Sequence, residues 1–318
     1  MLFVIIIFLI VLFLVSHAIA QVGWSKINRY TVWDYLFDMV NILFMLALMF
    51  VTIYPMYYVI VASVTNNLAL LATPGFLWYP KGFTLGSFKL AFTHPLIISG
   101  YRNIIFIMFW GLILNISLTL FAGFFLASKD VYFKKPVLFI ILFTMFFNAG
   151  MIPNFLNIRS LGLYNSMWSL IIPGAVSVYN TIICRTAIMG IPESLLESAK
   201  IDGANDLVVL FRIITPLIKP TIVVLVLYYG IGHWNSWFNA SIYIRDLTKL
   251  PIQNILRSIL VANSDILNAA ATEKDQINQF AESIKYAAIV ITTVPILFIY
   301  PFLQRYFVKG VMIGAVKG

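Results

Sequence analysis

The sequence predicts an all-α integral membrane protein. Of its 318 residues, 61% are hydrophobic and 10% are charged, and the mean hydropathy is +0.95. Soluble domains carry about 25% charged residues, so a water-soluble globular domain is excluded. A helix needs about 20 mainly apolar residues to cross the hydrocarbon core of a bilayer. Seven stretches qualify, at residues 2–20, 36–64, 104–127, 136–158, 166–185, 221–243 and 284–303.

The net charge of +9 indicates membrane orientation rather than nucleic-acid binding, because the 21 Lys and Arg residues are scattered between the apolar stretches. The short loop 128–135 contains Lys129, Lys134 and Lys135, and the positive-inside rule places it in the cytoplasm. Counting alternately from this loop puts segments 26–35, 186–220 and 304–318 inside and segments 65–103, 159–165 and 244–283 outside.

The first apolar stretch, 2–20, also resembles a signal peptide, since it ends in Ala18-Ile19-Ala20. It lacks a basic segment at its start, and cleavage would invert every later helix. We therefore interpret residues 1–25 as an extra N-terminal transmembrane helix or uncleaved signal anchor. A gene start placed too early, with the functional chain beginning near Ile27, is the alternative.

Two outer segments are longer than simple connections. Residues 65–103 are rich in Pro, Gly and aromatic residues, which predicts a folded, irregular segment. Residues 244–283 form the most polar part of the chain, and a loop of this length is typical of a functional one.

Metal, redox and ion-coupled chemistry lack support in the sequence. Cys184 is the single cysteine, and the three histidines are far apart, so no metal site is predicted. The interiors of the last five apolar stretches contain no Asp or Glu. Ion-coupled carriers place ionisable groups at membrane depth, so this absence argues against that class.

The cytoplasmic segment 186–220 predicts a helix–glycine–helix unit on the membrane surface. Pro192 suits a first helical position, and Glu193 suits the first turn, where the helix dipole favours an anion. Gly203 permits a sharp bend. Asn205 or Asp206 is expected to cap the second helix.

This segment resembles a known family. Glu197-Ser198-Ala199, three residues, Gly203, nine residues and Ile213-x-Thr215-Pro216 match the EAA loop of ABC importer permeases, E-A-A-x3-G-x9-I-x-L-P, except at Ser198 and Thr215. The resemblance extends over about residues 34–318 and is similar to the carbohydrate-uptake branch that includes the maltose permease subunits. The tail 307–318 and Trp234-Asn235-Ser236-Trp237 carry this likeness.

The resemblance implies a type I importer permease domain of six helices over residues 34–318, to which the N-terminal helix is an addition. It also implies that the loop 186–220 docks in a cleft of a separate ATPase. The chain has no GxxxxGK[ST] motif, so it is expected to bind no cofactor and to leave ATP and Mg to that partner. The coupling residues would be Glu193, Glu197, Ser198, Ala199, Asp202, Gly203, Arg212 and Pro216. An amphipathic surface helix without a partner is the alternative.

A substrate path is predicted from aromatic and amide side chains in the later stretches. Aromatic rings stack on sugars, and amides bond their hydroxyls. Trp234 and Trp237 are expected on neighbouring positions of one helix face. The candidates are Asn148, Asn154, Tyr179, Asn180, His233, Trp234, Asn235, Trp237 and Asn239. Interfacial anchoring and hydrogen bonding between helices are the alternative roles.

These observations predict a permease subunit of an ATP-driven, binding-protein-dependent importer of sugars, most simply oligosaccharides, in a bacterial plasma membrane. The expected partners are a second homologous permease, two cytoplasmic ATPases, membrane lipid and an extracellular or periplasmic sugar-binding protein that touches loop 244–283. An ABC permease for amino acids or peptides, an ion-coupled secondary transporter and a receptor without transport are the alternatives.

Overall fold

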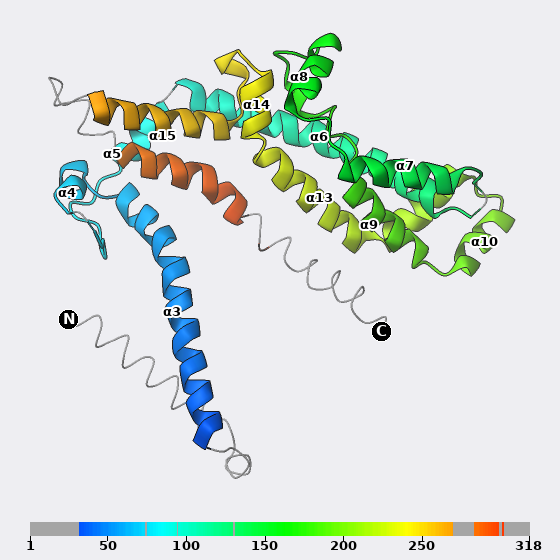
Figure 1. The fold of residues 1–318 in the computed structure, drawn as a ribbon, viewed down its shortest axis with the longest axis horizontal. Helices are drawn as coiled ribbons and strands as arrows, with labels where there is room; N and C mark the ends of the chain where they lie inside the picture. The colour runs from blue at the N-terminus through cyan, green and yellow to red at the C-terminus, as the bar shows by residue number, and fades with distance from the viewer. Residues whose placement is uncertain are drawn as a thin grey trace. The chain divides into compact units, whose positions relative to one another are not determined.

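The computed structural model describes residues 32–73, 75–93, 95–129, 131–269, 283–298 and 301. The predicted span 2–20, the choice between anchor and signal peptide, and the tail motif 307–318 lie outside these residues. The chain divides into two units, residues 1–58 and 59–318. Figure 1 shows the course of the chain. Regular structure in the described residues is helical, apart from an isolated antiparallel bridge between Thr65 and Phe83.

Helix α3, Val32–Ser63, contains the predicted span 36–64 almost completely. Its apolar part, Leu36–Ser63, is 28 residues long, which is more than a bilayer crossing requires. The helix ends where the Ser63 and Thr65 hydroxyls donate to the carbonyls of Ile60 and Val61, at 2.7 and 2.6 Å. These bonds satisfy carbonyl groups of the last turn.

The segment 65–103 is folded, as its turn-rich composition predicts. It contains the short helices α4, Asn67–Leu71, and α5, Gly86–Thr93. The Asn66 side chain caps α4 by accepting the Leu68 N–H at 3.0 Å. The following helix begins at Pro95 rather than at residue 104, because the apolar pattern continues back to this proline.

Helix α6, Pro95–Ala127, is the centre of the second unit. It packs against α9, Val178–Met189, α13, Lys219–Trp234, and α15, Ile252–Ala269 (Figure 1). Through Ile104, Ile107 and Leu120 it contributes to three separate clusters of buried apolar side chains. The position of α6 therefore decides how the other helices pack.

Three predicted continuous spans are broken in the structure. The span 136–158 is divided into α7, Lys134–Phe146, and α8, Met151–Ser160, with a bend of 117°. The span 166–185 contains a 3-10 turn, Met167–Leu170, before α9. The span 221–243 divides between α13 and α14, Trp237–Tyr243. Gly150, with φ +89°, and Pro173 mark the first two breaks.

The prediction of one long loop over 244–283 is also wrong for its described part. A 3-10 turn, Leu247–Lys249, leads into α15, whose Ile252, Ile255 and Ile259 are buried. This spacing produces one apolar helix face that packs on α6 and on the helix Ser283–Phe298. The last helix matches the beginning of the predicted span 284–303.

Within the described residues, two single helices are long and apolar enough to cross a membrane, Leu36–Ser63 and Leu96–Ala127. The number is at most four if each of two bent pairs is counted as one span, namely Lys134–Phe146 with Met151–Ser160 and Asp206–Leu217 with Lys219–Trp234. The all-α membrane fold is thus confirmed, whereas the exact number of spans stays a prediction.

The packing of α15 on α6 depends on Gly100. A Cβ added there would lie 2.4 Å from Cδ1 of Ile255 and 3.1 Å from the backbone Cα of Ile252. We expect Gly100→Ala to lower the free energy of unfolding by about 1–3 kcal/mol through overpacking, measured as a lower thermal midpoint in detergent. Gly232→Ala in α13 is the control, because no atom lies within 4 Å of its added Cβ. Equal midpoints for the two variants would contradict this packing.

Candidate coupling surface and substrate path

The predicted coupling segment folds as a short exposed helix followed by a kinked return. Helix α10 covers Glu193–Ile201 and directly follows Pro192. Glu193 lies in the first turn and Lys200 in the last, and each charge has the sign that the helix dipole favours at its end. In Figure 1, α10 lies beyond the end of α9.

The turn that ends α10 explains the spacing between Ala199 and Gly203. The Gly203 N–H donates to the Lys200 carbonyl at 3.1 Å, and the Ala204 N–H donates to the Ala199 carbonyl at 3.0 Å. This pair of bonds is the Schellman motif, which requires a left-handed residue after the helix. Gly203 has φ +80°, and a Cβ there would meet no atom within 4 Å. Glycine is therefore needed for its backbone conformation and not for space.

The return to the membrane begins with a side-chain cap. Asn205 accepts the Val208 N–H at 2.9 Å at the start of α11, Asp206–Val208, so Asn205 is the capping residue of the two candidates. A π-helix, Val209–Ile214, and the short helix α12, Thr215–Leu217, follow. The Thr215 backbone N–H and hydroxyl both bond the Leu210 carbonyl, five residues back. The path then bends by 86° into α13.

Ala199 is an exception among the predicted coupling residues. It is buried in an apolar cluster with Ile188 of α9 and Leu210, Ile214 and Leu225 from the return path and α13. Ala199 was predicted to take part in docking to the ATPase, but in this chain its small side chain fills the core side of α10. The exposed residues are Glu193, Glu197, Ser198, Asp202, Gly203, Arg212 and Pro216.

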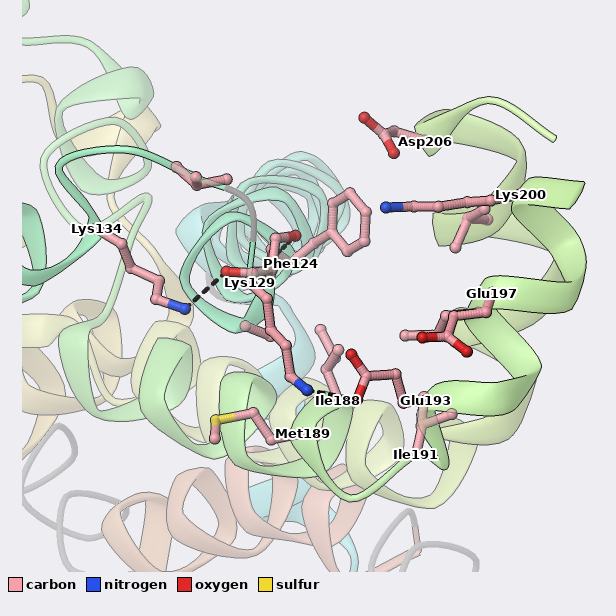
Figure 2. Close-up of a pocket in the computed structure, with 15 residues that line it drawn as sticks. Phe124, Lys129, Lys134, Ile188, Met189, Ile191, Glu193, Glu197, Lys200 and Asp206 are labelled. Atoms are coloured by element: carbon pink, nitrogen blue, oxygen red, sulfur yellow. Dashed lines mark hydrogen bonds and ion pairs between the residues drawn. The ribbon is translucent and has the colours of Figure 1, made fainter. Parts of the chain in front are cut away.

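Two predicted coupling acids face a cavity of about 850 Å³ between α10 and the end of α6. Glu193 forms an ion pair with Lys129, which lies in the loop after α6 (Figure 2). Glu197 and Lys200 point into the same cavity. Ile201 is 86% exposed and does not line this cavity. Two acids of α10 thus line the cavity, whereas the exposed Ser198, Ile201 and Asp202 lie outside it.

Sequence reasoning missed a stripe of small and polar residues on α6. Gly111, Asn115 and Thr119 follow each other at intervals of four and therefore share one helix face. The Thr119 hydroxyl lies 2.7 Å from the Tyr229 hydroxyl, and Asn115 Oδ1 lies 2.7 Å from His233 Nε2. A Cβ on Gly111 would lie 2.5 Å from His233 Nε2. The signal that could have predicted this stripe is Asn115, an amide inside an apolar segment.

The same stripe satisfies the backbone at the break before α9. Asn115 Nδ2 donates to the carbonyls of Gly174 and Ala175, both at 2.9 Å. The Tyr229 hydroxyl accepts the Ser177 N–H at 3.0 Å. Non-helical backbone at membrane depth requires such partners. His233, predicted to line the substrate path, is buried and bonded within this network.

Two further amides of the predicted path organise the break between α7 and α8. Asn148 Oδ1 accepts the Gly150 N–H at 2.9 Å, and Asn154 Nδ2 donates to the same oxygen at 3.5 Å. Both residues are exposed. Tyr179 is exposed on α9 with its ring centroid 6.1 Å from that of Tyr228, whereas Asn180 is buried.

The tryptophan cluster does not share one helix face, which corrects that prediction. The helix breaks after Trp234, so Trp234 ends α13 and Trp237 begins α14. Trp234 packs among Ile104, Ile252 and other residues of the α6–α15 core. Its Nε1, like Ser236 Oγ, is buried without a hydrogen-bond partner in the described part of the chain. Trp237, Asn235 and Asn239 are exposed.

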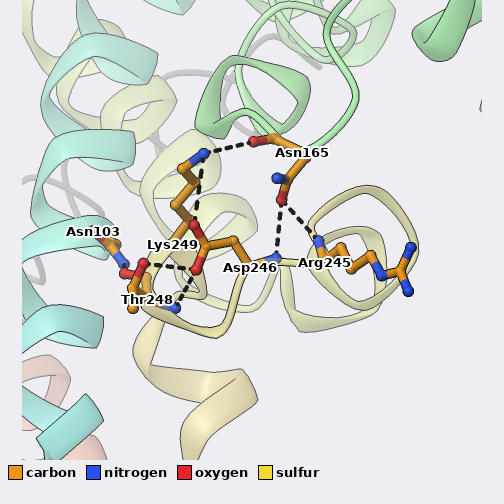
Figure 3. Close-up of polar contacts among 6 residues, drawn as sticks. All are labelled: Asn103, Asn165, Arg245, Asp246, Thr248 and Lys249. Carbon is orange, nitrogen blue, oxygen red and sulfur yellow. Dashed lines mark hydrogen bonds and ion pairs between the residues drawn. The ribbon is translucent and has the colours of Figure 1, made fainter.

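A polar turn after α14 connects it to α15 (Figure 3). Asn165, with φ +58°, accepts the N–H groups of Arg245 and Asp246 at 3.0 and 2.9 Å. Hydrogen bonds from the side chain and backbone of Thr248 hold the pKa of the Asp246 carboxyl below its usual value. Asn103 of α6 donates to the Thr248 and Leu250 carbonyls.

The chain is similar to known transport proteins over most of its length. No protein-family model matches it. The chain is 36% identical over 283 residues to the polygalacturonan/rhamnogalacturonan transport system permease protein YtcP of Bacillus subtilis (strain 168), over 89% of this chain and 99% of that protein. The chain belongs to the permease subunits of ABC sugar importers. It is also 40% identical to Protein LplC of the same strain, over 89% and 95% of the two chains.

Solved structures agree with this permease family. A chain from a bacterial ABC transporter involved in the import of the acidic polysaccharide alginate matches with a TM-score of 0.80 and 29% identity, over 87% of this chain and 99% of that chain. A second alginate ABC transporter structure, at 19% identity and a TM-score of 0.56, shares the fold. The membership confirms the resemblance carried by the 186–220 motif and excludes an ion-coupled secondary transporter.

The permease's Schellman turn predicts a local cost for any side chain at position 203. Gly203→Ala forces an L-residue into the left-handed region, at a cost of about 1–2 kcal/mol. We expect faster hydrogen–deuterium exchange in 193–204, while exchange in α13 stays unchanged. Gly174→Ala, at an open position without positive φ, is the control. Unchanged exchange in the Gly203→Ala variant would show that the turn does not need glycine.

The α6 stripe predicts that Asn115 is a stability determinant of the permease. Asn115→Leu leaves the carbonyls of Gly174 and Ala175 and the His233 ring without their partner, so we expect the free energy of unfolding to fall by about 2 kcal/mol or more. The thermal midpoint of the purified permease checks this. Asn239→Leu removes an exposed amide from α14 and should leave the midpoint nearly unchanged. A similar midpoint for both variants argues against the network.

Proposed function

We propose that this permease subunit imports oligosaccharides as part of a complete ABC importer in a bacterial plasma membrane, which it crosses several times. The relatives support this substrate class, because their names refer to polygalacturonan/rhamnogalacturonan, arabinooligosaccharides and melibiose/raffinose/stachyose. None of these three relatives is named for amino acids or peptides, so that alternative gains no support from them.

The proposed partners supply functions for which this sequence has no motif. The chain has no phosphate-binding GxxxxGK[ST] motif. We propose that two cytoplasmic ATPase subunits bind ATP and Mg and hydrolyse the ATP, and that a second homologous permease completes the path. A sugar-binding protein outside the membrane would deliver substrate, with segment 244–283 as its contact. This chain would itself catalyse no reaction.

The geometry of α10 carries the coupling proposal. Through Ala199 its core side shares an apolar cluster with α9 and α13, while Ile201 and Ser198 are exposed. A helix held in this way moves with its neighbours, so displacement of α10 by an ATPase would displace α9 and α13. ATP binding would thereby favour an outward-open state, and hydrolysis would return the bundle, giving alternating access.

Among the residues predicted to line the substrate path, the exposed ones are best placed to contact a sugar. Tyr179, Asn148, Asn154, Trp237 and Asn239 offer rings and amides that a sugar can stack on or bond. His233, Trp234 and Asn180 are buried, and Asn235 is the C-cap of α13. We propose that His233, Trp234 and Asn235 shape the path by holding the break between α13 and α14, and that Asn180 supports it from α9.

The coupling proposal is tested in the complete complex, prepared with the ATPase, second permease and binding protein encoded beside its gene. In proteoliposomes, we expect oligosaccharide-stimulated ATP hydrolysis to fall at least about tenfold in Glu197→Lys, Gly203→Pro and Ile201→Asp. Proline fixes φ near −65°, which is incompatible with the +80° of Gly203. Aspartate would replace an exposed apolar contact at position 201 by a charge.

Lys135→Gln, an exposed change in α7 outside the cavity, is the control and should keep full stimulation. Assembly is followed by gel filtration of each complex. If the three variants assemble and keep coupled hydrolysis, α10 does not transmit the ATPase movement. If the wild-type complex takes up peptides or amino acids and no oligosaccharide, the substrate proposal is wrong.

A further inference from the structure

A second cavity lies between α14 and α15, away from the coupling surface. Its volume is about 410 Å³, and Ser241, Arg245, Asn254 and Arg257 give it a polar side beside apolar residues. No Asp or Glu is among its described lining residues. The cavity thus combines two guanidinium groups with hydroxyl and amide groups and carries no lining acid.

Arg257 is held at this cavity by an aromatic ring. Its guanidinium carbon lies 4.2 Å from the centroid of the Trp237 ring. Stacking of this kind fixes the plane of the guanidinium and leaves its N–H edge available for hydrogen bonds. Because Trp237 already restricts the Arg257 side chain, Arg257 would lose less conformational entropy on binding an anion.

Arg245 reaches the cavity from the polar turn. Its guanidinium points away from Asp246 and forms no ion pair with any residue that the structure describes (Figure 3). The Asp246 carboxylate accepts two hydrogen bonds from Thr248 and lies 3.8 Å from Lys249 Nζ. The neighbouring acid is thus already occupied, and the charge of Arg245 is available to a ligand.

Asn254 provides a third polar feature. It is 7% exposed, and its Nδ2 donates to the Trp237 carbonyl and to Ser241 Oγ, both at 2.9 Å. These two bonds fix the amide plane against α14. Its Oδ1 is buried and has no donor among the described residues. Asn254 therefore forms a fixed part of the cavity wall and holds Ser241 in place.

We propose that Arg245 and Arg257 bind the carboxylate of an acidic sugar unit, a uronate, in the transported oligosaccharide. The inference rests on the proposed function and specifies its substrate class. Arginine pairs with carboxylate through two parallel N–H···O bonds. The Ser241 and Ser258 hydroxyls and the apolar side chains in the same lining suit the rest of a sugar ring. The charge pattern predicts segment 244–283 outside, so the site would meet the substrate as it arrives.

The test uses the complete transporter with its binding protein in proteoliposomes. Uptake is measured for a labelled uronate trimer and for the same trimer with its carboxylates reduced to alcohols. The variants are Arg245→Gln, Arg257→Gln, their double variant and Arg257→Lys, which keeps the charge and loses the planar fork. Arg159→Gln removes an exposed arginine of α8 outside the cavity and is the matched control.

We expect the wild type and Arg159→Gln to prefer the uronate trimer. In the double variant the KM for this trimer should rise at least about tenfold with the maximal rate retained, as expected for losing charge-assisted hydrogen bonds. KM for the reduced trimer should stay the same in all variants. Arg257→Lys should fall between the wild type and Arg257→Gln.

Three results would overturn the inference. They are a wild type that prefers the reduced trimer, a double variant that keeps the preference, and an equal loss of uptake for both trimers. The last result would show that the arginines bind anionic lipid or the binding protein. In each case oligosaccharide uptake persists and the proposed function stands. A complex that takes up neither trimer nor any other oligosaccharide overturns the proposed function and this inference together.

Discussion

This structure depends on one constraint: where a helix breaks, the backbone N–H and C=O groups that it leaves free must find hydrogen-bond partners. Inside a bilayer, a helix can stop only where the freed N–H and C=O groups find partners in the protein. Here the partners are side chains of neighbouring helices. Asn115 donates to both carbonyls of residues 174–175, and Tyr229 accepts the Ser177 N–H. In the segments predicted outside, Asn103 donates in the same way to two carbonyls around the turn after α14. Because Asn103 and Asn115 belong to α6, this helix contacts both irregular segments.

Hydropathy predicted the membrane class and the positions of the long helices, but not the breaks. A hydropathy average over about 20 residues does not detect a helix break of two or three residues. The stretches 166–185 and 221–243 were therefore predicted as continuous spans. The breaks depend on contacts between distant residues, such as Asn115 with the carbonyls after Pro173. Local chemistry was more informative in the coupling loop, where the conformation of Gly203 and the cap of Asn205 follow from neighbouring residues alone.

The two departures from the family motif have structural reasons. Ser198 replaces alanine at an exposed position, where its hydroxyl bonds the Ser194 carbonyl, so either small residue fits. Thr215 replaces leucine where the π-helix ends, and its hydroxyl bonds the Leu210 carbonyl. The second alanine of the motif, Ala199, is buried beneath the turn. The spacing of the motif therefore reflects the backbone conformation of the loop. The substitutions at Ser198 and Thr215 are compatible with that conformation.

The hydrogen bonds that α6 donates to distant carbonyls also bear on how the chain enters the membrane. A carbonyl left open in lipid is costly, and the segment around 174–175 has no helix of its own to satisfy it. Asn115 precedes its acceptors in the sequence. During synthesis, α6 is therefore already made when the segment around 174–175 emerges. The donor side chain on α6 thus enters the membrane before the backbone carbonyls that need it.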